Sequence, residues 1–336
     1  MNTYIIDAIR TPIGKFGGTL KDIRTDDLAA IPIKEIIARN KINPKNINDV
    51  ILGCANQAGE DNRNIARMAL LLAGLPYSVP GETINRLCAS GMSSIINAHR
   101  AIKARDGDLF IAGGIENMTR GPWVISKVSK PYGRDAQMFD SSFGWRFINP
   151  KMKEMYGVDG MGTTAENLAQ KFNISREDQD KFAYNSQLKA FKAQSSGRFS
   201  EEIVPVSIPQ RKAEPILFDN DEFIKGNTTL EVLAKLRTAF KKDGGTVTAG
   251  NASGLNDGAA AMLLASDNGI KDNNLTPIAK IISSAVVGVE PRIMGIGPVE
   301  ASNIALKKAG LKLSDMDIIE LNEAFSAQAL ACIRSW

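Results

Sequence analysis

Asn85-Arg86-Leu87-Cys88-Ala89-Ser90-Gly91-Met92 marks a change of secondary structure in the predicted fold. Before it, residues 80–84 have the pattern of a turn followed by a short strand. Cys88 is therefore predicted to lie where a strand gives way to a helix. The helix is indicated by residues at helical spacing, namely Met92, Ile95, Ile96, His99 and Ile102.

The first turn of a helix is a favourable place for a reactive thiol. Its backbone amides have no partner within the helix, and the helix dipole favours negative charge there. Both effects favour the thiolate, which is the reactive form of cysteine. Ala89, Ser90 and Gly91 are small, so a ligand can approach the sulfur closely. The alternative is that Cys88 is an ordinary buried cysteine, and such thiols are usually inert.

Length and composition indicate a large globular protein. The 336 residues suffice for two or three domains, and 43% hydrophobic with 23% charged residues is an ordinary balance. A formal net charge of +4 is too small to indicate a nucleic-acid partner, but it suits an anionic, phosphorylated small molecule. No stretch is long and apolar enough to span a bilayer, and no leader precedes the strand-like residues 4–8. We therefore expect a cytoplasmic protein with no membrane partner.

Cysteine and histidine counts argue against metal and disulfide chemistry. Cys54, Cys88 and Cys332 form an odd set without paired spacing, so we expect neither a disulfide framework nor a zinc site. The one histidine, His99, follows Cys88 on the same predicted helix by about three turns. It is therefore predicted to be structural and not the base that activates Cys88.

Strands and helices alternate in the first part of the chain. Strands are predicted at residues 3–9, 49–52, 81–84 and 108–114, with helices between them at 26–39, 65–72 and 91–102. This alternation predicts an α/β fold with a mostly parallel sheet covered on both faces. It stops near Arg120, and residues 121–245 are predicted to form an inserted subdomain with helices at 164–172 and 176–193.

Strand signals return after the insertion. We predict strands at 246–248, 258–266, 277–289 and 317–321, and helices at 298–310 and 325–332. The unit ending in Asp317–Leu321 is similar to the unit ending in Asp49–Leu52, which indicates two duplicated α/β halves. The second half has few of the strands this duplication requires. We therefore expect its last portion to be missing.

Four motifs together resemble those of the thiolase family, in order and spacing and over essentially the whole chain. They are Asn85–Met92, Ala112–Met118 (AGGIENM), Thr248–Ala259 (TAGNASGLNDGA) and Asn322–Phe325 (NEAF). The resemblance implies duplicated βαβαβαββ halves in five layers, α-β-α-β-α, with an inserted loop subdomain and an incomplete second half. The expected domains are 1–120 plus 246–268 as the N-terminal half, 121–245 as the insertion, and 269–336 as a truncated C-terminal half.

Within the family, Arg10–Gly18 and Asp140–Pro150 look most like the 3-oxoadipyl-CoA thiolases of the β-ketoadipate route in aromatic catabolism. Acetoacetyl-CoA thiolases are the near alternative. The resemblance implies that a cysteine thiolate attacks a 3-oxoacyl-CoA and that an acetyl-cysteine intermediate passes its acetyl group to CoA. CoA is thus a co-substrate and no cofactor is permanently bound. A full-length homodimer or homotetramer is also implied, with residues 108–114 as a candidate edge strand for pairing.

Individual residues take roles from the matched motifs. Cys88 matches the nucleophile, and Asn322 matches the family's asparagine that holds a water for a developing oxyanion. Their alternatives are a buried thiol and a loop asparagine. The matched substrate and CoA contacts are Ser253 (pantetheine), Lys225 (nucleotide), Met161 and Met294 (acyl thioester region), and Phe325 (substrate or CoA). The alternatives for these positions are a turn serine, a solvated lysine and core-filling side chains. Arg134 and Arg146 are candidates for the far carboxylate of an oxoadipyl group.

The sequence also departs from the family pattern. Thiolases carry a Gly-His-Pro motif and a Cys-x-Gly motif, and neither occurs in this chain. His99 does not replace the missing histidine, so the chain as given is expected to be inactive or nearly so. Two other functions stay open: a non-catalytic CoA- or lipid-binding module, and a condensing enzyme of the ketoacyl-synthase type. Residues 248–259 and 322–325 argue against the second.

Overall fold

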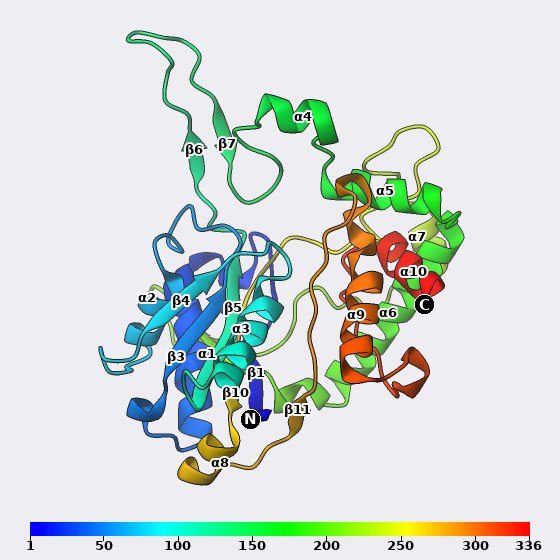
Figure 1. The fold of residues 1–336 in the computed structure, drawn as a ribbon. Helices are drawn as coiled ribbons and strands as arrows, with labels where there is room; N and C mark the ends of the chain where they lie inside the picture. The colour runs from blue at the N-terminus through cyan, green and yellow to red at the C-terminus, as the bar shows by residue number, and fades with distance from the viewer. The chain divides into compact units, whose positions relative to one another are not determined.

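A mixed sheet of seven strands organises the first of two units into which the chain divides (Figure 1). The computed structural model describes residues 1–336, and this unit comprises Met1–Phe143, Gly197–Phe223 and Leu255–Ile282. The strand order is β11-β1-β10-β5-β3-β4, and β2 pairs with β10. The strands are β1 Thr3–Arg10, β2 Gly14–Lys15, β3 Asp49–Gly53, β4 Gly81–Ile84, β5 Leu109–Asn117, β10 Asn256–Ala265 and β11 Ala279–Ile281.

The strand directions differ in part from the predicted, mostly parallel sheet. β3 pairs in parallel with β4 and β5, as the alternation of strands and helices predicts. β10, however, returns after the insertion and pairs antiparallel with both β1 and β5, with Ala260 opposite Gly114. The sheet is therefore mixed. Because β5 lies between β10 and β3, the prediction that residues 108–114 form an edge strand is wrong. Their apolar character reflects burial under helices on both faces.

Helices cover both faces of this sheet, as predicted. α1 (Thr25–Arg39) and α2 (Ile65–Leu72) pack into one core cluster, to which Val50 and Leu52 of β3 also belong. α3 (Ser90–Ala104) packs on the other face, where it meets Ile51. Successive residues of a strand point to opposite faces of the sheet, so β3 contributes side chains to both core clusters. Each fully buried Leu or Ile side chain stabilises the fold by about 1.5–3 kcal/mol.

Short elements complete the first unit. Two antiparallel hairpins pair β6 with β7 and β8 with β9. The bounds are β6 Trp123–Ile125, β7 Met138–Asp140, β8 Val206–Ile208, β9 Ile216–Phe218, α8 Asp267–Asn273, and the 3-10 segments Thr19–Asp22, Pro44–Asn46 and Arg198–Glu201.

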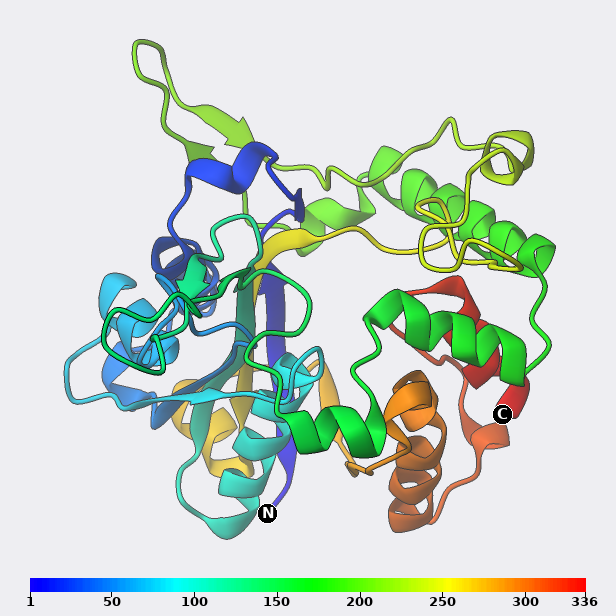
Figure 2. The same cartoon turned by 90° about the horizontal axis from the view of Figure 1, so that it is seen from above.

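Helices make up the second unit, which comprises Gly144–Ser196, Ile224–Gly254 and Ser283–Trp336. In its core, Ala165 and Leu168 of α5 pack with Ala327 and Ala331 of α10, and Figure 2 shows these two helices side by side. Its elements are α4 Pro150–Tyr156, α5 Met161–Lys171, α6 Arg176–Ser195, α7 Leu230–Ala234, α9 Gly297–Ala309, α10 Ser326–Ser335, and the 3-10 segments Pro291–Ile296 and Leu313–Asp315. The predicted helices at 164–172, 176–193, 298–310 and 325–332 are thus confirmed.

Three of the strands predicted for the later part of the chain are wrong or much shorter. Of residues 277–289, only Ala279–Ile281 forms a strand, and it pairs with β1. Residues 317–321 are irregular, and the side chains of Ile318 and Ile319 are exposed. Residues 246–248 contribute a single bridge, between Thr248 and Thr238. Branched apolar runs form strands only beside a partner strand, and most residues of these three runs have none. The second sheet that a five-layered duplication requires is therefore not formed.

No helix has the length and apolarity needed to cross a membrane.

Candidate active site

Cys88 lies in a short loop between a strand and a helix, as predicted. β4 ends at Ile84 and α3 begins at Ser90. The alternative of a buried cysteine is excluded, because Cys88 is exposed. Its thiol is thus open to solvent and stands directly before the first turn of α3.

Side-chain hydrogen bonds fix the backbone of this loop. Asn85 Oδ1 accepts a hydrogen bond from the Leu87 amide at 2.9 Å. Ser90 Oγ donates to the Leu87 carbonyl at 2.6 Å and accepts from the Arg86 amide at 2.8 Å. Leu87 itself has φ +49°, in the left-handed region that non-glycine residues rarely adopt. Such a conformation persists only where its surroundings hold it, and here they do so next to Cys88.

The first turn of α3 lies against the sheet because several contacting residues are small. Ser94 Oγ lies 2.7 Å from the carbonyl oxygens of Gly91 and Gly113, and it accepts a hydrogen bond from the Gly113 amide at 3.0 Å. A Cβ on Gly53, at the end of β3, would lie 2.3 Å from the carbonyl carbon of Ser90. Neither Gly53 nor Ser94 was predicted as a site residue from the sequence, although both hold the first turn of α3 against the sheet.

His99 is a structural histidine, as predicted. Its side chain is buried, and Nδ1 lies 2.9 Å from Thr3 Oγ1. Burial lowers the pKa of His99, and the nearby positive charges of Lys103 and Arg100 lower it further. His99 is therefore neutral at pH 7 and is engaged with β1.

The other two cysteines contrast with Cys88. Both Cys54 and Cys332 are buried. Burial raises the pKa of the Cys54 thiol, and the negative charges of Glu116 and Asp61 raise it further. Burial also raises the pKa of the Cys332 thiol. Because nucleophilic cysteines react as thiolates, these two thiols are unreactive and Cys88 is the candidate nucleophile.

Two of the predicted site segments of the second unit lie side by side. The Ser253 amide donates to the Ala324 carbonyl at 2.8 Å, and Ala252 forms a β-bridge with Phe325. This pairing brings residues 248–254 of the Thr248–Ala259 motif next to the Asn322–Phe325 motif, all within the second unit. Ser253 and Asn322 are both exposed at this junction. Phe325 is half-buried and makes an edge-to-face contact with Phe240, with ring centroids 6.2 Å apart.

The remaining predicted contacts are more scattered. Met161 begins α5 and is 46% exposed, and Met294 lies in the 3-10 segment Pro291–Ile296 and is 41% exposed. Lys225 is exposed, and its amide donates to Gln187 of α6. Arg134 lies exposed in the first unit, whereas Arg146 lies half-buried in the second. The first unit carries Cys88, and the second carries the other matched positions: Asn322, Ser253, Lys225, Met161, Met294 and Phe325.

An exposed cysteine at the start of a helix, packed on the central sheet, defines the chain as an α/β protein with a candidate thiol nucleophile. The chain belongs to the thiolase family and is an acyltransferase enzyme: the family's N-terminal domain matches residues 3–268 and its C-terminal domain matches residues 275–336.

Relatives and solved structures agree with this assignment. The chain is 57% identical over 334 residues to a β-ketoadipyl-CoA thiolase of Acinetobacter baylyi, covering 99% of this chain and 83% of the relative. It is 56% identical over 332 residues to the 3-oxoadipyl-CoA/3-oxo-5,6-dehydrosuberyl-CoA thiolase of Escherichia coli, covering 98% and 82%. The crystal structure of human mitochondrial 3-ketoacyl-CoA thiolase in complex with CoA superposes with a TM-score of 0.91 at 41% identity, covering 99% of this chain and 82% of that one. The thiolase fold is thereby confirmed.

These matches correct one expectation from the sequence. The family match does not support an incomplete second half, because the C-terminal domain matches residues 275–336, although these residues form no separate sheet in the structure. The expected inactivity of the chain rests on the absent Gly-His-Pro and Cys-x-Gly motifs, which this match does not test, so it stays a prediction. Membership of the thiolase family also replaces the ketoacyl-synthase alternative.

Proposed function

We propose that the chain cleaves 3-oxoadipyl-CoA with CoA to give succinyl-CoA and acetyl-CoA. The observation that carries this proposal is the 57% identity, over 99% of the chain, to a β-ketoadipyl-CoA thiolase. The exposed thiol of Cys88, directly before the first turn of α3, supplies the chemistry that the reaction requires.

The proposed reaction has two steps. The Cys88 thiolate adds to the C3 keto carbon, and the C2–C3 bond then breaks. The electron pair of that bond goes to C2, which takes a proton and leaves as acetyl-CoA. The succinyl group stays on Cys88 Sγ as a thioester until the thiolate of CoA attacks its carbonyl carbon. The Sγ–C bond then breaks, which gives succinyl-CoA and releases the Cys88 thiolate. Atom balance thus corrects the expected intermediate: cleavage of 3-oxoadipyl-CoA leaves succinyl on the sulfur, and the reverse condensation passes through the same succinyl-cysteine. An acetyl-cysteine would arise only with acetoacetyl-CoA as the substrate.

Asn322 is the proposed oxyanion-binding residue, through a water that it holds. Its exposure at the junction of the Ser253 and Phe325 segments supports this role, since a ligand can reach it there. Donors aimed at a developing negative charge typically lower a barrier by about 3–4 kcal/mol.

The proposed CoA contacts are Ser253 and Lys225, and the proposed acyl contacts are Met161, Met294 and Phe325. Exposure supports the two methionines, because a methionine that merely fills a core gap is buried. CoA is a co-substrate in this proposal, and no permanently bound cofactor takes part. Arg134 and Arg146 are the proposed partners of the far carboxylate, which a guanidinium binds through two parallel hydrogen bonds.

Two structural expectations belong to the same proposal. One is that the chain divides into three domains: 1–120 plus 246–268, 121–245, and 269–336. The other is a homodimer or homotetramer. β4 is an outer strand of the sheet in one chain, so it is the strand we propose for pairing between copies.

The test is to mix the chain with 3-oxoadipyl-CoA and measure the intact mass. We expect a succinyl adduct on Cys88 that disappears when CoA is added. Cys88→Ser should form no thioester adduct and lose CoA-dependent cleavage, while Cys332→Ala, which changes a buried thiol, should retain both. Binding of CoA without any adduct would instead favour the non-catalytic CoA-binding module.

A second assay separates the two thiolase substrates. We expect a higher kcat/KM for 3-oxoadipyl-CoA than for acetoacetyl-CoA, which has no terminal carboxylate. Arg146→Gln should lower kcat/KM for the first substrate and leave the second unchanged. Equal kcat/KM for both substrates would favour the acetoacetyl-CoA alternative.

A further inference from the structure

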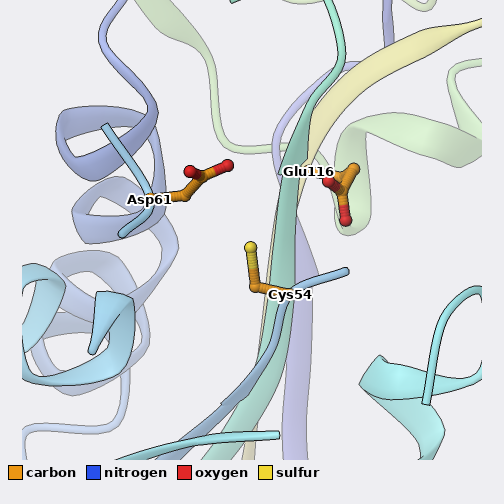
Figure 3. Close-up of side chains that lie close together, drawn as sticks. All are labelled: Cys54, Asp61 and Glu116. Atoms are coloured by element: carbon orange, nitrogen blue, oxygen red, sulfur yellow. The ribbon is translucent and has the colours of Figure 1, made fainter. Parts of the chain in front are cut away.

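Three protonatable side chains lie close together (Figure 3). They neighbour residues 85–89, the nucleophile loop that carries Cys88, because Asn85 binds the Ala55 carbonyl next to Cys54. Cys54 follows the end of β3, Asp61 lies in the loop beyond it, and Glu116 lies near the end of β5. Their sulfur and carboxylate atoms all lie within 4.8 Å of one another. That spacing would suit a metal ion. The hydrogen bonds of Glu116 indicate a different role, which is to hold the backbone of a neighbouring loop.

Both carboxylate oxygens of Glu116 already bind backbone amides. Oε2 accepts a hydrogen bond from the Ala55 amide at 2.8 Å, and Oε1 accepts one from the Asn56 amide at 3.1 Å. Glu116 therefore spans from β5 to the loop that follows β3. A metal ion at the cluster would compete with both of these hydrogen bonds.

The loop that Glu116 binds, at Ala55 and Asn56, in turn holds the nucleophile loop. The Ala55 carbonyl accepts a hydrogen bond from Asn85 Nδ2 at 2.9 Å. Asn85 Oδ1 then accepts the Leu87 amide, also at 2.9 Å, and Leu87 has the left-handed backbone that precedes Cys88. The Cys54 amide adds a parallel connection, donating to the Ile84 carbonyl at 3.0 Å.

We propose that Glu116 is a positioning residue for Cys88, acting through Ala55, Asn85 and Leu87. The proposal rests on Cys88 being the nucleophile of the proposed thiolase reaction. The hydrogen bonds of Glu116 are made to the loop that follows β3 and not to Cys88. It fixes the loop that fixes Leu87, and a nucleophile displaced by about 1 Å commonly loses about a hundredfold in rate.

Burial explains why this carboxylate is sensitive to change. Desolvation raises the pKa of Glu116, and the negative charge of Asp61 raises it further, while the two backbone amides oppose the shift. The neighbouring titratable groups are Asp61 and Cys54, and burial raises the pKa of each of them too. Amide donors that lose a buried acceptor are costly to leave unpaired, so the loop responds when Glu116 loses its charge.

The test compares Glu116→Gln with Asp61→Asn. Both remove one carboxylate from the same cluster, of which Asp61 is buried and Glu116 half-buried, but Asp61 accepts from the Gly59 amide and has no part in the path to Leu87. In Glu116→Gln we expect faster amide hydrogen exchange in residues 54–57 and 85–88. Succinyl transfer to Cys88 should slow about tenfold to hundredfold while the KM for 3-oxoadipyl-CoA stays within about twofold. Asp61→Asn should change neither quantity.

Asn85→Ala provides the coupling test. If the two residues act in one path, the variant carrying both Glu116→Gln and Asn85→Ala transfers succinyl no more slowly than the slower single variant. Multiplied losses would overturn the proposal. So would unchanged exchange at 85–88 in Glu116→Gln, or stoichiometric Zn²⁺ binding that Glu116→Gln abolishes. The exchange measurement needs no turnover, so it decides the role of Glu116 even if wild-type Cys88 forms no adduct and the proposed function fails.

Discussion

Gly53 lies directly beneath Ser90, so closely that a Cβ on Gly53 would stand 2.3 Å from the Ser90 carbonyl carbon. The end of β3 and the start of α3 therefore share a space that no larger residue fits. Cys88 stands two residues before Ser90, and its position depends on that contact.

Gly53→Ala should destabilise the first unit and disturb Cys88. The added methyl group meets backbone atoms, which cannot move aside as a flexible side chain can, so we expect a loss of about 1–3 kcal/mol in the free energy of unfolding. Urea denaturation measures this. Gly288→Ala is the control, since a Cβ on Gly288 meets nothing within 4 Å. Equal stability of the two variants would contradict the close packing.

Glu166 should be a stabilising residue of the second unit. Its buried carboxylate accepts hydrogen bonds from the Thr246 amide, the Thr246 hydroxyl and the Val247 amide, at 2.9–3.0 Å. Glu166→Ala leaves these donors unpaired, each at a cost of about 1–3 kcal/mol. We expect a lower urea midpoint and weaker CoA binding, because the segment leading to Ser253 loosens. Glu154→Gln, an exposed change on α4, should stay within about 0.5 kcal/mol of wild type.

Glu60 should make stability depend on acid pH. The hydrogen bonds from Arg120 lower the pKa of Glu60 to about 2, with help from the Thr25 amide and the charge of Arg24. The folded-state pKa thus lies below the ordinary value of 4.5, so this contribution is fully present above pH 4.5 and is lost as the pH falls towards 2.

The measurement for Glu60 is urea denaturation at several pH values between 7 and about 2.5. Wild type should lose stability in this range more steeply than Glu60→Gln, which has no charge to lose. Parallel curves for the two proteins would contradict the ion pair with Arg120.

Iodoacetamide should label the native chain at Cys88 alone. Cys54 and Cys332 are buried and have raised pKa values, so they react only after local opening, which slows them by about a hundredfold or more. Peptide mass mapping over time checks this, with labelling in urea as the control in which all three thiols react. Rapid native labelling of Cys54 would contradict the prediction.

Local signals were enough to predict the surroundings of Cys88. The strand, the turn and the helix from Gly81 to Ala104 are encoded in adjacent residues, and the structure confirms each of them. The structural role of His99 was predicted equally well, because three turns of one helix place it too far from Cys88 to act as its base.

Contacts between distant residues were not predictable in the same way. Residues 317–321 have a strand composition but no partner, and composition carries no information about partners. The antiparallel pairing of β10 with β1 and β5 depends on the direction in which the residues between β5 and β10 return the chain to the sheet. Glu116 and Ala55 are 61 residues apart, so no sequence spacing connects them. Four ordered motifs nevertheless identified the family, because their order reflects ancestry and does not require any pairing to be known.

The unequal burial of the three cysteines has a practical use. With Cys54 and Cys332 enclosed, the unaltered chain offers a single attachment point for a fluorophore or spin label. No cysteine has to be removed first, so spectroscopic work can begin with the natural sequence.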